Sequence, residues 1–312
     1  MSTGLTSQHF IVLGTGAWGV ALATHLARQQ HAVTMWGHHA PATDLAKAFA
    51  VRDDAIVLIA VPSFAFQETL DRIKPYVTAK TRIVWGTKGL SAQGAFLHEL
   101  CEHTYPNLPL AVLSGPSFAA EVMQNLPTAV TIASNNPAFG NDLVQAFYSD
   151  VFRAYLSSDI IGVQLGGVVK NVLAIAVGMS DGLGFGANAR AALITRGLAE
   201  LSRLGAALGA QPITFMGLSG VGDMILTCTD NQSRNRRFGL ALGEGLSVDE
   251  AQARVSKVIE GKDNAKKIML LGAKMAIEMP ICQQVYAVLY ESLPASQAVK
   301  NLLTRTIPDS EF

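Results

Sequence analysis

A glycine-rich turn near the start of the chain has the spacing of a phosphate-binding loop. Gly14, Gly16 and Gly19 form a G-x-G-x-x-G pattern between the apolar run 10–13 and the apolar helical stretch 20–23. Gly14 permits a tight turn, Gly16 lets the backbone approach a pyrophosphate, and Gly19 lets helix and strand pack closely. The helix start adds unpaired N–H groups and a positive dipole end. The pattern predicts dinucleotide binding; the alternative is a turn that only packs.

The residues after the second apolar run bear on which dinucleotide is bound. A site selective for NAD usually has Asp or Glu there, which accepts a hydrogen bond from the ribose 2′-hydroxyl. Here the chain reads Trp36-Gly37-His38-His39, without an acid. Nothing in this segment repels a 2′-phosphate, and a protonated imidazole favours one. We expect NADPH to be preferred over NADH, unless the two histidines are only solvated loop residues.

Lys88 is a candidate for contact with a substrate. In an open α/β sheet, ligands bind outside the carboxyl ends of the strands. Four segments leave predicted strands at such ends, and Lys88 is the only charged residue in them; the segments are 14–19, 62–63, 87–89 and 114–117. The alternative is a lysine that simply faces solvent, as most do.

Lys170 is a candidate general acid or base. It lies in the apolar stretch 165–173, where a lysine either extends its charge to the surface or works in a desolvated pocket. All seven histidines lie at or before His103, so lysine is the natural proton donor of the second half. Its pKa would have to fall from about 10.4 toward ~7–8. Burial beside a second cation, Lys88, would act in that direction.

A glycine-dense turn and a basic cluster supply further candidates. Asp223 ends the turn 217–223 and could orient Lys170, or merely cap a helix. Arg234, with Asn235 and Thr227, could form a planar donor set for a phosphate dianion, which a guanidinium suits better than an ammonium does. One of the three arginines 234, 236 and 237 is expected to bind substrate, and the other two are expected to be surface charges.

The elements that must position these residues divide the chain in two. Continuous apolar runs, typical of parallel strands covered on both faces, occur at 10–13, 33–36, 56–61, 83–85, 110–113 and 130–133. Helical segments alternate with them at 18–29, 64–73, 94–103 and 141–148. This alternation predicts a doubly wound, Rossmann-type α/β sheet.

After about residue 158 the periodicity becomes helical. Apolar residues repeat at helical spacing from Leu193 to Leu208, and the segments 251–259, 265–277 and 281–293 also indicate helices. A length of 312 residues suggests two domains at about 150 residues each. We predict a dinucleotide-binding domain at 1–160 and an all-helical substrate and catalytic domain at 161–312.

Composition excludes several classes of protein. The net charge is zero and 49% of residues are hydrophobic, so the chain is neither disordered nor broadly attracted to nucleic acid or anionic lipid. No unbroken apolar run reaches about 18 residues, and the start lacks the basic residues of a secretory leader. Three scattered cysteines predict neither disulfides nor a metal site and fit the cytoplasm. The apolar excess makes a homodimer plausible.

Taken together, the motifs resemble one enzyme family. The chain is similar to bacterial NAD(P)-dependent glycerol-3-phosphate dehydrogenases from about residue 10 to about residue 290. The motifs that carry the resemblance are GTGAWG at 14–19, WGH at 36–38, WGTKGL at 85–90, SGPSFA at 114–119, GGVVKN at 166–171, GMSDG at 178–182, ITRG at 194–197, GD at 222–223, RNR at 234–236 and VIEG at 258–261. The resemblance implies interconversion of dihydroxyacetone phosphate and sn-glycerol 3-phosphate, which feeds phospholipid synthesis.

The resemblance also implies roles for individual residues. Lys170 would be the proton donor or acceptor, with Lys88 and Asp223 beside the substrate. The substrate phosphate would be held by Arg234 and Asn235, and the other substrate contacts would come from Gly115, Ser117, Asn171, Thr227 and Ser233. The dinucleotide would be lined by Ala17, Trp18, His38, Lys88, Ala119, Arg234, Val258 and Glu260, in addition to the glycine turn.

The connection after His38 departs from the family pattern. Family members carry a longer stretch there, with an Asn and a Leu-Pro pair, which is absent from this sequence. The residues from Gly37 to Asp54 still suffice for a crossover, which needs about a dozen. Our hypothesis is that a mobile segment is missing from the printed chain rather than from the gene; an intact-protein mass of 33.1 kDa would exclude it.

Two other functions remain open from the sequence. A β-hydroxyacid-type dehydrogenase also joins a dinucleotide domain to helices with a catalytic lysine, but the segments 87–89 and 233–235 disfavour it. A dinucleotide-binding sensor without turnover would not need Lys170 and Asp223. Turnover of a substrate that must carry a phosphate discriminates among the three.

Overall fold

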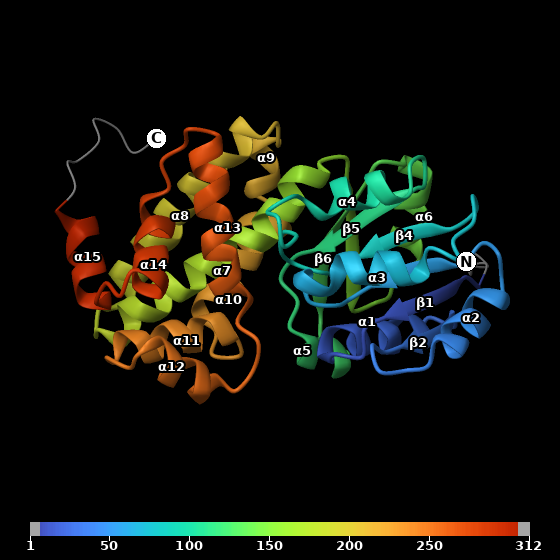
Figure 1. Ribbon diagram of the computed structural model, residues 1–312, viewed down its shortest axis with the longest axis horizontal. Coiled ribbons are helices and arrows are strands. Elements are labelled where there is room, and N and C mark those ends of the chain that lie inside the picture. The colour runs from blue at the N-terminus through green and yellow to red at the C-terminus, as the bar shows by residue number, and fades with distance from the viewer. Residues whose placement is uncertain (1–6, 305–312) are drawn as a thin grey trace. The chain divides into compact units, whose positions relative to one another are not determined.

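The computed structural model describes residues 7–304, which form two compact units that divide between residues 164 and 165 (Figure 1). The first carries every strand found in the described part of the chain, and the second is built from helices.

A sheet of seven strands forms the centre of the first unit, counted over residues 7–164. Its order is β2-β1-β3-β4-β5-β6-β7. The bounds are β1 (His9–Leu13), β2 (Ala32–Trp36), β3 (Ile56–Ile59), β4 (Arg82–Trp85), β5 (Leu110–Ser114), β6 (Thr128–Ser134) and β7 (Phe152–Ser157). Strands β1 to β5 are mutually parallel, so their carboxyl ends share one edge of the sheet. The predicted Rossmann-type sheet is confirmed.

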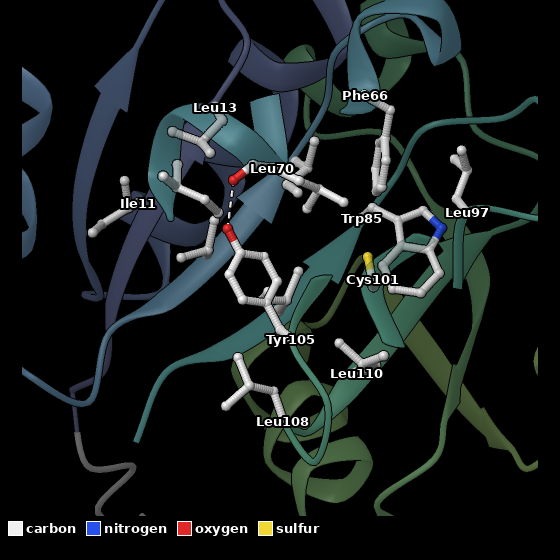
Figure 2. Close-up of a cluster of buried hydrophobic side chains, with 14 of the residues drawn as sticks. Ile11, Leu13, Phe66, Leu70, Trp85, Leu97, Cys101, Tyr105, Leu108 and Leu110 are labelled. Carbon is white, nitrogen blue, oxygen red and sulfur yellow. Dashed lines mark hydrogen bonds between the residues drawn. The ribbon is translucent and has the colours of Figure 1, made fainter. Parts of the chain in front are cut away.

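Helices cover both faces of this sheet because side chains alternate along each strand. Phe10 and Val12 of β1 pack on the face covered by α1 (Ala17–Arg28), α5 (Ala119–Met123) and α6 (Pro137–Phe147). Ile11 and Leu13 pack on the opposite face, under α2 (Ala42–Ala50), α3 (Phe66–Ile73) and α4 (Leu97–Thr104). Figure 2 shows this second cluster, in which the Tyr105 hydroxyl donates to the carbonyl of Leu70. The glycine turn therefore starts from a strand that is buried on both sides.

Two features of the sheet differ from the expectation. Strand β6 runs antiparallel to β5, because the intervening helix α5 has only five residues and is too short to return the chain to the opposite edge. Strand β7 was not predicted from the sequence. It is a partly exposed edge strand without a continuous apolar run, and it pairs in parallel with β6.

The second unit is assembled around one long helix, α7 (Ile160–Gly182), whose first residues belong to the first unit. The other elements are α8 (Ala187–Ala207), α9 (Pro212–Phe215), the π-helical turn η2 (Leu218–Gly222), α10 (Asp223–Thr229), α11 (Arg234–Gly243), α12 (Val248–Val255), α13 (Glu260–Lys274), α14 (Pro280–Tyr290) and α15 (Ala295–Leu303). The helical second half is thus as expected. Helix α7 is long and apolar enough to cross a membrane, but 94% of its most apolar window is buried inside the protein. It is the core helix of this unit.

Helices α7 and α11 touch at their backbones through glycines. A Cβ on Gly239 of α11 would lie 2.1 Å from the carbonyl oxygen of Ile175, and one on Gly178 of α7 would lie 2.2 Å from that of Arg236. The same applies one turn further on, where Gly182 and Gly243 face each other's helix. Such distances leave no room for any side chain. This contact fixes the helix that carries Lys170 against the helix that begins with Arg234.

Candidate active site

The glycine turn of the first unit has the shape that a pyrophosphate requires. Gly14 has a φ of +120°, and a Cβ there would lie 2.6 Å from the carbonyl oxygen of Ala60. A Cβ on Gly19 would lie 2.1 Å from the carbonyl oxygen of Gly14, so both positions demand glycine. At Gly16, by contrast, a Cβ would meet nothing within 4 Å. The turn therefore presents open backbone directly before the N-terminus of α1, and these residues fit a dinucleotide.

Two neighbouring segments are packed against this turn. A Cβ on Gly37 would lie 2.9 Å from Oγ1 of Thr15, which places the end of β2 beside the turn. On the other side, a Cβ on Gly86 would lie 2.6 Å from Nε1 of Trp18. Trp18 therefore joins the glycine turn to the segment that leads into Lys88. His38 is exposed in the turn that directly follows β2.

Lys88, Gly115 and Ser117, which were predicted to contact substrate, form one cluster at the carboxyl edge of the first unit. Nζ of Lys88 donates to the carbonyl oxygen of Gly115 at 2.9 Å, and Oγ of Ser117 donates to the same oxygen at 3.1 Å. Gly115 has a φ of +143°, and a Cβ there would lie 3.0 Å from Cα of Val130. Ala119 begins α5 two residues after Ser117.

Lys170, Asp223 and Thr227 form a buried polar cluster in the second unit. Nζ of Lys170 donates to the carboxylate of Asp223 and, at 3.1 Å, to Oγ1 of Thr227, which in turn donates to Asp223 at 3.3 Å. The side chain of Lys170 is 7% exposed and that of Asp223 is 1% exposed. Lys170 therefore does not extend its charge to the surface. The Asp223 carboxylate stabilises its ammonium form.

Local backbone geometry brings Asp223 to Lys170. The turn η2 is π-helical, a form that recurs at functional sites, and Asp223 follows it at the start of α10. A Cβ on Gly166, one turn before Lys170, would lie 2.1 Å from the carbonyl oxygen of Ser219, so only glycine lets η2 approach α7 this closely. Cys228, next to Thr227, is fully buried, and this burial raises the pKa of its thiol to about 12. Cys228 is thus a neutral thiol at the edge of the cluster.

A second buried network links Asn171 and Asn235. Nδ2 of Asn235 donates to Oδ1 of Asn171 at 2.9 Å, while Oδ1 of Asn235 accepts from the backbone N–H of Gly261 at 2.9 Å. Nδ2 of Asn171 donates to the carbonyl of Gly167 and to the carboxylate of Glu260 at 3.4 Å. The amides therefore tie α7 and α11 to the start of α13, where Glu260 is half-buried. Val258 lies two residues earlier and is exposed.

The three arginines of α11 have different environments. Arg234 and Arg237 are exposed, whereas Arg236 is buried, which corrects the expectation that Arg236 is a surface charge. Arg236 pairs with the buried carboxylate of Asp181 and donates to the carbonyl of Cys228 at 3.0 Å. Ser233 is buried and caps α11 by accepting a hydrogen bond from the N–H of Arg236.

The structure thus groups the predicted residues into two sets. Gly14 to Gly19, His38, Lys88, Gly115, Ser117 and Ala119 belong to the first unit, and Lys170, Asn171, Asp223, Thr227, Ser233, Arg234, Asn235, Val258 and Glu260 belong to the second. The lowering of the Lys170 pKa by Lys88 stays a prediction. Sequence reasoning missed the partner of Arg236, Asp181, although a carboxylate within the apolar stretch 172–182 was a usable signal.

Comparison with known proteins covers both units. The family model described as NAD-dependent glycerol-3-phosphate dehydrogenase N-terminus matches residues 9–49 and 40–140, and the model of the C-terminus of that enzyme matches residues 159–300. The glycerol-3-phosphate dehydrogenase [NAD(P)+] of Edwardsiella ictaluri is 48% identical over 338 residues, covering 99% of each chain. That of Halorhodospira halophila is 50% identical over 327 residues, covering 96% of this chain and 98% of the relative.

Solved structures include a similar protein that carries the same enzyme name. The crystal structure of glycerol-3-phosphate dehydrogenase from Coxiella burnetii has a TM-score of 0.89 and 48% sequence identity, and covers 96% of this chain and 99% of its own. A 2-dehydropantoate 2-reductase from Geobacter metallireducens, at 16% identity and a TM-score of 0.59, shares the fold alone. On identity and coverage, this chain belongs to the NAD-dependent glycerol-3-phosphate dehydrogenase family.

Proposed function

We propose that the chain reduces dihydroxyacetone phosphate to sn-glycerol 3-phosphate with NADPH as its preferred cofactor, and that the product feeds phospholipid synthesis. The observation that carries the proposal is the buried cluster of Lys170, Asp223 and Thr227 in a chain of this family. A buried lysine with a dedicated carboxylate partner is a group arranged for proton transfer.

Reduction of the ketone requires a hydride on carbon and a proton on oxygen. When bound, the reduced nicotinamide supplies the hydride. Lys170 acts on the oxygen: its ammonium attracts the negative charge that develops there and then transfers a proton to it. Asp223 keeps the ammonium protonated before transfer, and Thr227 holds Nζ from the other side. In the reverse reaction, Lys170 takes the proton back.

The phosphate of the substrate is assigned to the first residues of α11. Arg234 is exposed at the start of that helix, where a guanidinium and the helix N-terminus both favour a dianion. The side chains of Asn171 and Asn235 are hydrogen-bonded to each other. This supports a role for both in keeping the start of α11 rigid as well as in contacting the phosphate. Lys88, Gly115 and Ser117 are assigned to the substrate from the first unit.

The cofactor preference, the location and the oligomeric state are parts of the same proposal. The absence of an acid in the segment 37–39 supports preference for NADPH. The three buried cysteines, which are all free thiols, support a cytoplasmic location. The apolar composition supports a homodimer. Sedimentation equilibrium tests the dimer directly, with a monomer mass as the contradicting result.

The test of the proposed function is the rate of NADPH oxidation with dihydroxyacetone phosphate. Unphosphorylated dihydroxyacetone and NADH serve as controls. We expect rapid turnover that requires the phosphate, and a higher kcat/KM with NADPH than with NADH. Turnover of a hydroxy acid instead of the phosphorylated ketone would identify a different dehydrogenase. Tight NADPH binding without turnover of either would identify a sensor.

A further inference from the structure

Strand β2 is an edge strand of the sheet. Its carboxyl end is where a Rossmann fold binds the adenosine ribose of the cofactor. In Rossmann folds with strand order 3-2-1-4-5-6, another strand lies outside the second one. Here no strand pairs with the outer side of β2 within residues 7–304. The alignments with relatives span 338 and 327 positions, more than the 312 residues of this chain, and the two matches of the N-terminal family model overlap at 40–49. The alignments with these relatives therefore include positions that this chain lacks.

Arg72 reaches the end of β2 from the neighbouring helix α3. Its Nη1 donates to the carbonyl oxygen of His38 at 3.3 Å, and its guanidinium carbon lies 5.6 Å from the centre of the Trp36 ring. The end of β2 is the point at which Rossmann folds distinguish a ribose 2′-hydroxyl from a 2′-phosphate. Arg72 thus brings a permanent positive charge to that point.

The guanidinium is held in place and remains accessible. Nε and Nη2 of Arg72 donate to Oε1 of Glu68 at 3.1 and 2.6 Å. The side chains of Arg72 and Glu68 are 37% and 53% exposed, so a ligand can reach the pair. Glu68 orients the guanidinium toward β2, and its own negative charge opposes a phosphate. The two residues therefore act in opposite directions on the same group.

The other cations near β2 are directed elsewhere. Between residues 37 and 55 the cationic side chains are Lys47 and Arg52. Lys47 is highly exposed and pairs with Asp44 of its own helix. Arg52 pairs with Asp54 and donates to the carbonyl of Ser7, which precedes β1 and so lies at the opposite edge of the sheet from the glycine turn. Of these three cations, Arg72 is the one whose hydrogen bonds fall on the turn after β2.

We propose that Arg72 binds the 2′-phosphate of NADPH and that the Arg72–Glu68 pair determines the cofactor preference of this chain. The proposal rests on the proposed function, since it assigns the residue responsible for the preference stated there. A guanidinium can pair two N–H groups with a phosphate, and the imidazoles of His38 and His39 in the same turn can offer further N–H donors.

Binding measurements test the assignment without relying on turnover. Isothermal titration with 2′-phospho-ADP-ribose and with ADP-ribose compares the wild-type chain with Arg72→Gln, Glu68→Gln and Lys74→Gln. Lys74 is an exposed lysine at the end of α3 and controls for the general loss of positive charge. We expect Arg72→Gln to weaken binding of the phosphorylated probe by about 10- to 100-fold. Binding of ADP-ribose should change by no more than about fivefold in any variant.

Glu68→Gln should leave binding of the phosphorylated probe as tight as in the wild type or tighter. Equal weakening of both probes by Arg72→Gln would overturn the proposal, because Arg72 would then serve the adenine or the fold. So would an unchanged affinity for the phosphorylated probe. Arg72→Lys, which keeps the charge, should retain part of the preference and guards against a folding defect. Turnover by the wild-type chain is measured separately, so a failed proposed function is recognised independently.

Discussion

Lys170 and Asp223 are 53 residues apart in the chain, and their side chains are joined by a hydrogen bond inside the second unit. One comes from the middle of α7 and the other from the start of α10. The bond exists because the π-helical turn η2 packs on Gly166 with its backbone. The position and the charge of the Lys170 side chain therefore depend on two separate segments, α7 and α10.

Substitutions of Lys170 and of Asp223 should both lower kcat, but only the second should shift its pH profile. Lys170→Met removes the acid and should lower kcat by about 10²- to 10⁴-fold. Asp223→Asn should lower kcat less and shift the alkaline limb of the kcat profile to lower pH, because the amide no longer stabilises the ammonium. Steady-state kinetics across pH measure both effects. Lys266→Met, at an exposed lysine of α13, is the control and should behave as wild type. An unshifted alkaline limb in Asp223→Asn would contradict the role of Asp223.

The three arginines of α11 should separate by what each substitution changes. Arg234→Ala should raise the KM for dihydroxyacetone phosphate and leave the melting temperature unchanged. Arg236→Ala leaves the buried carboxylate of Asp181 with its ion pair to Arg190 but removes the one to Arg236, and should cost about 1–3 kcal/mol of unfolding free energy. Arg237→Ala is exposed and should change neither quantity. Steady-state kinetics and thermal denaturation of the three variants measure the KM and the melting temperature. An unaltered KM in Arg234→Ala would show that Arg234 is a surface charge without a role in substrate binding.

The glycine contact between α7 and α11 predicts that a single methyl group is harmful. Gly239→Ala would place Cβ 2.1 Å from the carbonyl oxygen of Ile175, so the helices must separate. We expect a loss of about 1–3 kcal/mol or more in unfolding free energy, together with reduced activity. Gly186→Ala, where a Cβ meets nothing within 4 Å, is the control and should cost no more than about 1 kcal/mol, since Gly186 is the N-cap of α8. Urea denaturation compares them, and equal stability of both variants would refute the prediction.

Buried histidines of the first unit predict a loss of stability in mild acid. Nε2 of His25 donates to the carbonyl of Phe147 at 2.8 Å, and Nε2 of His31 donates to that of Ala146 at 3.1 Å. Burial lowers the pKa of both imidazoles below the usual 6.5, so the unfolded chain binds protons more readily. Their contribution is complete above pH 6.5 and falls as the pH drops through the lowered folded-state pKa, by at most about 1.4 kcal/mol per pH unit for each histidine.

Urea denaturation between pH 5 and 8 measures this slope. In His25→Gln the amide can still donate to Phe147 but does not titrate, so the slope below pH 6.5 should be shallower than in the wild type. His103→Gln, at an exposed histidine, should keep the wild-type slope. A slope that is the same in all three proteins would exclude His25 as a source of the acid sensitivity.

Local patterns predicted the parts of the fold that local interactions decide. The buried parallel strands are continuous apolar runs, and the glycine turn is dictated by backbone conformation at Gly14. The direction of β6 could not be predicted, because it follows from the length of the short helix α5. Strand β7 was missed because its exposed side chains break the apolar pattern.

The same distinction applies to the site. Lys170 was found because a lysine is conspicuous in an apolar stretch, and its link to Asp223 was one of two readings of a glycine-dense turn. The burial of Arg236 was missed: Asp181 in its apolar stretch signalled a buried partner, but which arginine it pairs with is decided only when α7 and α11 have packed. The mutual bond between Asn171 and Asn235 likewise arises only once these helices meet.

The contact between α7 and α11 also bears on substrate length. Because glycines bring the two backbones together, the spacing between Lys170 and Arg234 does not depend on the volume of any side chain at that crossing. Under the proposed roles, the rigid packing of these two helices sets the distance between the carbonyl group and the phosphate of a substrate that can bind. Larger side chains at the crossing cannot increase this distance without separating the two helices. Binding of a longer sugar phosphate would therefore require a phosphate-binding residue at a different position.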